Sequence, residues 1–73
     1  MTHETMIRDG IHAAIGILHQ LLFTATLDSS EANGHMANGD RNTAIGTLLR
    51  IEPSVQQALD LYRAVIAMHR YKL

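Results

Sequence analysis

Apolar residues recur in alternating steps of four and three along the first part of the chain. The residues that follow this spacing are Ile7, Ile11, Ala14, Leu18, Leu21 and Ala25. Such spacing places side chains in one stripe of an α-helix and is typical of helices that pack in coiled coils and bundles. The strict alternation of a strand does not persist anywhere in the sequence. The sequence therefore predicts an all-α protein that begins with a long helix over about residues 3–30.

The tripeptide Ala-Asn-Gly occurs twice, at residues 32–34 and 37–39, and marks the loop-like part of the chain. Asn and Gly both tolerate the left-handed backbone conformation that ends helices. We therefore expect a tight reversal of direction in a loop over about residues 31–41. Asn38, Asp40 or Asn42 can cap the helix that follows.

The second half of the chain predicts a short helix over about residues 42–51 and a long one over about residues 53–71. Pro53 lacks a backbone donor and clashes with the preceding turn, so we expect it to break or kink this arm. The long helix has its own apolar stripe, which contains Val55, Ala58, Leu59, Tyr62, Val65, Ile66 and His69. Residues 1–73 are thus expected to form one domain, a helical hairpin with a long helix, an Asn/Gly loop and a Pro53-kinked second arm.

Both arms are expected to carry more apolar surface than a hairpin can bury. Each apolar arc covers roughly 180°, whereas packing on one neighbour needs about 100°. The chain has 73 residues and no cysteine, and small domains without disulfides commonly rely on metal ions or association. We therefore expect a homodimer that forms a four-helix-type bundle. Its core and dimer seam would contain Ile7, Ile11, Ala14, Leu18, Leu21, Val55, Leu59, Tyr62 and Ile66. The alternative is a three-helix monomer in which the short helix covers the open side.

No pattern in the sequence is typical of an enzyme or a cofactor site. The serines lack the glycine-flanked elbow of a hydrolase nucleophile, the acidic residues are scattered, and no glycine-rich phosphate loop occurs. Five histidines raise the question of a metal site, but His12 and His19 are seven residues apart. On a helix this is about 10.5 Å, too far for both to bind one ion. We predict no catalytic residue, no cofactor and no metal site, and keep a histidine-ligated metal-binding bundle as an alternative.

Two groups of residues are candidates for contact with another protein. Phe23 lies near the middle of the polar side of the first helix, and an exposed aromatic ring is typical of a contact site. Arg63 and Arg70 share a face of the last helix near Tyr71, and both residue types are common interface anchors. We expect these residues to bind an unidentified partner protein, so that the chain acts as a regulator, adaptor or inhibitor.

The charge pattern argues against a general nucleic-acid binder. Six Lys and Arg residues stand against seven Asp and Glu residues, which gives a net charge of −1, whereas binding to phosphates needs a basic excess. Because residues 41–73 are more basic than residues 1–40, a DNA-associated regulator that uses the Arg63/Arg70 face is the alternative. Polar side chains interrupt the most apolar stretch, residues 11–27, and no signal peptide is evident. The expected location is the cytoplasm, without membrane attachment.

Overall fold

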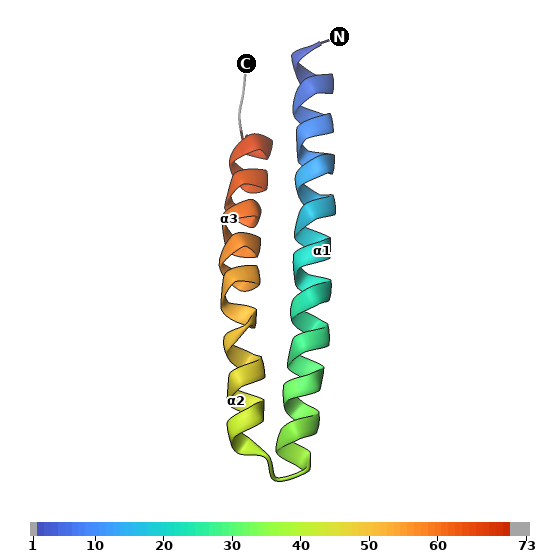
Figure 1. Cartoon of the computed structure of the whole chain (residues 1–73). Helices are drawn as coiled ribbons and strands as arrows, with labels where there is room; N and C mark the ends of the chain where they lie inside the picture. Colours follow the sequence, from blue (N-terminus) through green and yellow to red (C-terminus); the bar gives the residue numbers. More distant parts are fainter. Residues whose placement is uncertain (1, 71–73) are drawn as a thin grey trace.

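The computed structural model describes residues 2–70, which form two antiparallel arms that lie side by side (Figure 1). Helix α1 (His3–Ala37) is one arm, and helices α2 (Arg41–Leu49) and α3 (Ile51–Arg70) follow one another along the second. The molecule is a rod with extents of 55 × 14 × 13 Å. The all-α prediction is confirmed. The three-helix alternative is wrong, because α2 extends the line of α3 and does not cover the open side.

The turn between the arms is shorter than the loop predicted over residues 31–41, because α1 continues to Ala37. The first Ala-Asn-Gly copy is helical, since Ala32 is buried against the second arm and keeps this part of α1 in contact. The second copy makes the turn, with Gly39 in the left-handed region at φ 78°. The Gly39 N–H donates to the Met36 carbonyl at 3.0 Å and the Asp40 N–H to the His35 carbonyl at 2.9 Å. This pair of bonds is a Schellman motif, which satisfies the last carbonyls of α1.

The second arm breaks at Arg50, three residues before Pro53. The carbonyl of Leu49 would normally accept from the residue four positions later, but proline has no N–H and its ring clashes there. Pro53 itself lies in the first turn of α3, where a missing donor is tolerated. The expected break is therefore present, and the helix bounds move from about 42–51 and 53–71 to Arg41–Leu49 and Ile51–Arg70.

Side chains cap the start of both arms. The Thr2 hydroxyl accepts a hydrogen bond from the Thr5 N–H at 3.2 Å, and the Asp40 carboxylate accepts one from the Thr43 N–H at 3.1 Å. The hydrogen bond from the Thr43 side chain and, to a smaller extent, the one from its backbone N–H hold the pKa of Asp40 below its ordinary value. These caps satisfy N–H groups that the helix itself leaves unpaired.

The arms meet along a seam with alternating steps of three and four residues on both sides, the spacing of a coiled coil. In α1 the seam residues are Ile7, Ile11, Ala14, Leu18, Leu21, Ala25, Asp28, Ala32 and His35. In the second arm they are Ala44, Thr47, Ile51, Ser54, Ala58, Leu61, Val65 and Met68. All are buried or half-buried, and outside the seam only Thr5, Gly10 and Ile66 among residues 2–70 share that property. The most buried positions are Ala14, Ala32, Ala44, Thr47 and Ala58, which are all small, whereas the larger apolar side chains of the seam are half-buried.

The α1 half of the predicted seam lies between the arms, but the α3 half does not. Val55, Leu59 and Tyr62 are 48%, 40% and 55% exposed, so they lie outside the contact between the arms, and their place in a dimer seam stays a prediction. His69 of the same predicted stripe is exposed, and Ile66 is half-buried at the edge of the contact. The stripe of α3 that contains Val55, Leu59 and Tyr62 therefore faces outward, while the stripe that contains Ala58, Leu61 and Val65 packs on α1.

Candidate protein interface on one flank of the rod

Exposed apolar side chains gather on one side of the seam, on a surface that we call the apolar flank. It comprises the exposed Ile15 and Leu22 of α1, Ile45 and Leu48 of α2, and Val55, Leu59 and Tyr62 of α3, together with the half-buried Ile66 of α3. Each of these residues directly follows a seam residue in the sequence. In an antiparallel helix pair such positions lie on the same side of the seam in both arms. The two arms therefore contribute to one surface, in which Glu52 and His19 occupy the equivalent positions between the apolar side chains.

A groove of about 270 Å³ lies near the middle of the apolar flank. Its lining residues are Leu18, Leu22, Val55, Ala58, Leu59 and Tyr62, none of which is charged. The buried methyl group of Ala58 forms the floor, and the larger side chains on either side form the walls. A groove of this kind can accept apolar side chains from another helix.

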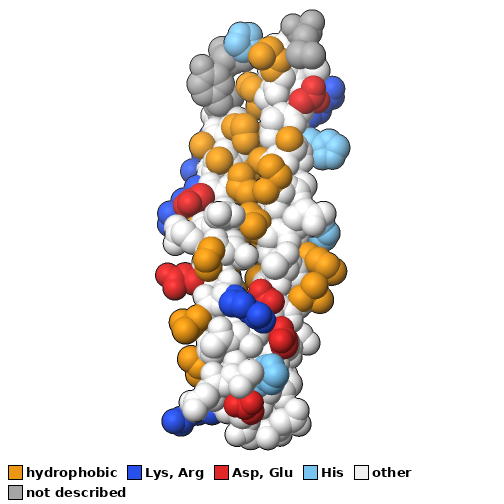
Figure 2. Space-filling model, viewed as in Figure 1, with side chains coloured by type: hydrophobic (Ala, Val, Ile, Leu, Met, Phe, Trp, Pro, Cys, Tyr) orange, Lys and Arg blue, Asp and Glu red, His pale blue; other side chains and the backbone are white. Residues whose placement is uncertain are grey.

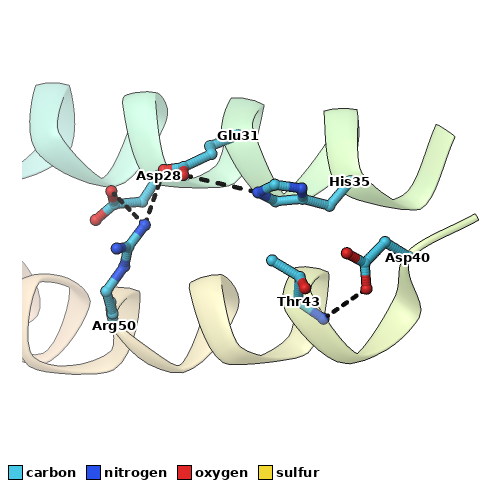
Figure 3. Close-up of polar contacts among 6 residues, drawn as sticks. All are labelled: Asp28, Glu31, His35, Asp40, Thr43 and Arg50. Carbon is cyan, nitrogen blue, oxygen red and sulfur yellow. Dashed lines mark hydrogen bonds and ion pairs between the residues drawn. The ribbon is translucent and has the colours of Figure 1, made fainter. Parts of the chain in front are cut away.

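The opposite side of the seam, which we call the polar flank, is formed by residues that directly precede seam residues. Arg50 donates to Glu31 at 2.8 Å and lies 3.7 Å from Asp28, so it joins the junction of α2 and α3 to α1 (Figure 3). Glu31 is also 3.7 Å from the His35 ring. Figure 2 shows positive and negative side chains together in the lower half of the rod and hydrophobic ones between the arms in the upper half.

A second hollow of about 330 Å³, lined by His3, Ile7, Ala67 and Met68, lies near the open end.

The structure does not bring the predicted partner-binding residues into one patch. Phe23 is 55% exposed and lies midway between two seam residues of α1, so it points away from the second arm. Arg63 and Arg70 are exposed and occupy the equivalent outer side of α3. Phe23 and the two arginines therefore face opposite directions. Tyr71 lies outside the described residues.

Within residues 2–70, no group of three or more His, Asp or Glu side chains lies close enough to hold a metal ion. His12 and His19 are exposed on α1, and His35 is the only described histidine in an ion-pair contact. The metal-binding alternative thus gains no support from the described part of the chain.

Helix α1 is long and apolar enough to cross a membrane by length and composition alone. Its most apolar 18-residue window has a mean hydropathy of 1.4, and 11% of that window is buried. Core helices of soluble proteins also meet these criteria, so this property is weak evidence. The cytoplasmic location expected from the sequence stays a prediction.

The contribution of α2 to the apolar flank and the ionic contacts of Arg50 were not predicted from the sequence. A usable signal was present, because Ile45 and Leu48 directly follow Ala44 and Thr47. That signal was hidden because the second-arm seam itself includes the polar residues Thr47 and Ser54.

Comparison with protein-family models, with curated proteins and with solved structures found no match. Function is therefore inferred from the geometry of the rod.

Proposed function

We propose that the protein is a small non-enzymatic interaction module that works as a homo-oligomer in the cytoplasm. It regulates, adapts or inhibits a partner protein by covering part of that protein's surface, without making or breaking a covalent bond. The observation that carries this proposal is the apolar flank, where exposed aliphatic and aromatic side chains of all three helices lie around an uncharged groove.

An apolar surface of this length is costly in water unless another molecule covers it. Monomeric soluble proteins rarely expose contiguous apolar patches of more than a few hundred Å². The flank spans both arms from Ile45 in α2 to Ile66 in α3. Its side chains are held by regular helices, so little backbone order has to be gained on binding. These properties suit an occupancy mechanism, in which a preformed helical surface covers a partner.

Phe23 and the Arg63/Arg70 face lie on the outer sides of α1 and α3, so they are accessible while the apolar flank is covered. We assign them to the partner protein. Arginine and aromatic side chains commonly provide most of the binding energy in such contacts. The two surfaces would contact different parts of a partner or two partners, because they face opposite directions.

The test is affinity capture from the native host with the native chain and with Phe23→Ala, Arg63→Glu and Ile15→Lys. We expect one identified protein at a fixed ratio to the native chain, and at least a tenfold loss of it with one of these variants. Circular dichroism must show unchanged helicity, and Gly46→Ala, at an exposed glycine with open space around its Cβ position, serves as the control. Capture that is identical for all variants would contradict the proposal.

The Arg63/Arg70 face also allows a direct test of the DNA-binding alternative. Both side chains are exposed and seven residues apart on one helix face. Phosphate contacts give an affinity that falls steeply with salt. A mobility shift at low salt that Arg63→Glu abolishes would favour a DNA-associated regulator over the interaction module.

A further inference from the structure

The rod exposes more surface than a folded protein of its mass. Its accessible surface is 5728 Å², whereas a compact monomer of 8.1 kDa exposes about 4,500 Å². Its radius of gyration is 16.8 Å, against about 11 Å for a compact domain of this length. The excess of about 1,200 Å² is larger than the roughly 800 Å² that each partner buries in a standard stable interface. A second copy could therefore cover the excess.

Six of the eight residues of the apolar flank are arranged symmetrically about its groove, whereas Tyr62 and Ile45 mirror Glu52 and His69. On α3, Val55 and Leu59 lie two residues on either side of Gln57, and Leu48 and Ile66 lie nine residues on either side. On α1, Ile15 and Leu22 are equally distant from the midpoint between Leu18 and His19. These two midpoints lie at the same level of the rod, because Leu18 and Ala58 line one groove.

We infer that the apolar flank binds a second copy of this chain around a two-fold axis that crosses the rod at the groove, with the two turns at opposite ends. This inference depends on the homo-oligomeric part of the proposed function and gives it a geometry. In this arrangement α1 packs on α1 and α3 on α3, both antiparallel. Ile15 then meets Leu22 of the partner subunit, Val55 meets Leu59 of the partner subunit, and Leu48 meets Ile66 of the partner subunit. These three pairs are apolar, whereas Tyr62 meets Glu52 of the partner subunit and Ile45 meets His69 of the partner subunit.

The opposite orientation, with both turns at one end, gives poorer pairs. It would place α2 of one copy on the last part of α1 of the other, where the flank positions are Thr26, Ser29 and Asn33. Ile45 and Leu48 would then cover polar side chains. With the turns at opposite ends, this polar part of α1 meets the region of Arg8 and His12 of the partner subunit instead, so polar positions meet polar positions.

The first experiment measures the association of two copies. Ile15 and Ile17 are both exposed isoleucines of α1, 47% and 55% exposed, and they lie on opposite sides of the seam. We expect sedimentation equilibrium to give twice the 8.1 kDa mass of the chain for the native protein and for Ile17→Lys. For Ile15→Lys we expect at least a 100-fold rise in the dimer dissociation constant. A native chain that is monomeric at micromolar concentration, or equal dissociation constants for both variants, would overturn the inference.

The second experiment measures the relative orientation of the two copies and needs no destabilising substitution. The chain has no cysteine, so Asn38→Cys in the turn provides a unique site for a spin label. With the turns at opposite ends, the labels should be about 60 Å apart, from about 1.5 Å per residue along each helix. A distance of about 10–20 Å, the width of one or two helices, would overturn the proposed geometry.

These outcomes separate the inference from the proposed function. If the native chain is monomeric and Ile15→Lys loses a captured host protein, the flank binds that protein and the second-copy inference is wrong. If the chain dimerises as described but captures nothing, the geometry is supported and the partner-binding role fails. A monomer that cosediments with phosphatidylcholine vesicles would overturn the inference in favour of a lipid surface.

Discussion

The two flanks of the seam border the same residues but differ in what covers them. On the polar flank, Arg50 contacts Asp28 and Glu31 across the arms, so charged groups find partners within one chain (Figure 3). On the apolar flank, Val55 and Tyr62 are about half exposed and find no cover within the described residues. The polar flank also exposes Met6, Ile17 and Leu27, so the comparison shows two sides of one helix pair that differ in how much apolar surface they expose.

The largest effect that separates the flanks is expected from charge placed next to the groove. Val55 and Gln57 are two residues apart on α3 and lie on opposite sides of the seam. A buried unpaired carboxylate costs on the order of 3 kcal/mol, which is roughly a 100-fold rise in the dissociation constant. We therefore expect Val55→Glu to abolish dimerisation and Gln57→Glu to preserve it in sedimentation equilibrium. Equal behaviour of the two variants would show that the flanks do not differ in association.

Substitutions of the glycines in and near the turn should change the free energy of unfolding without distinguishing the two flanks. Gly39 has a φ of 78°, which alanine adopts at a cost, whereas Gly34 is helical with nothing within 4 Å of an added Cβ. We expect Gly39→Ala to lower and Gly34→Ala to raise the free energy of unfolding, each by about 1 kcal/mol. Urea denaturation at one fixed protein concentration measures both. Shifts of the same sign would contradict the different conformations of the two Ala-Asn-Gly copies.

Removal of the ionic contacts should have a smaller effect, confined to the polar flank. Arg50→Met retains much of the apolar stem but loses both carboxylate contacts. Because the pairs are partly exposed, we expect a loss of less than about 1 kcal/mol of stability and no change in the dimer dissociation constant. The difference in melting temperature should largely disappear in about 1 M salt. A strong effect on dimerisation would mean that the polar flank is also an interface.

The smallest effect is expected from the cap of α2. The folded-state pKa of Asp40 is lowered from 3.8, so its charge stabilises the fold above that value. This stabilisation is lost as the pH falls through the lower folded-state pKa. Asn caps about as well but is neutral, so Asp40→Asn should melt slightly below the native chain near pH 6. The two melting curves should converge in acid, and a gap that widens below pH 3.8 would contradict the assignment of the cap.

The stripe of α1 that packs on the second arm could be predicted from the sequence, but its counterpart on α3 could not. Along α1 the heptad positions from Ile7 to Leu21 are apolar. In the second arm the same spacing includes Thr47 and Ser54, while a second apolar stripe with Val55, Leu59 and Tyr62 lies beside it. Periodicity identifies both stripes but does not decide which of them packs on α1. The Val55 stripe was therefore visible in the sequence, but its position outside the contact between the arms was not.

The turn shows the limit of local signals. Both Ala-Asn-Gly copies contain the same residues, yet the first is helical and the second reverses the chain. The deciding factor is the buried contact of Ala32 with the second arm, which depends on residues far away in the sequence. Phe23 and the two arginines lie on opposite sides of the rod, and this could not be predicted without knowing which residues of each arm form the seam.

None of the described residues is a large side chain with less than 2% of its surface exposed. A thin rod of this kind has little interior, so we expect the single chain to be less stable than the dimer. In the proposed dimer, mass action then links folding to abundance, because binding of a second copy stabilises only the folded chain. Scarce copies would be more exposed to unfolding and degradation, whereas abundant copies would protect one another. The amount of folded protein would thus rise more steeply than the amount synthesised.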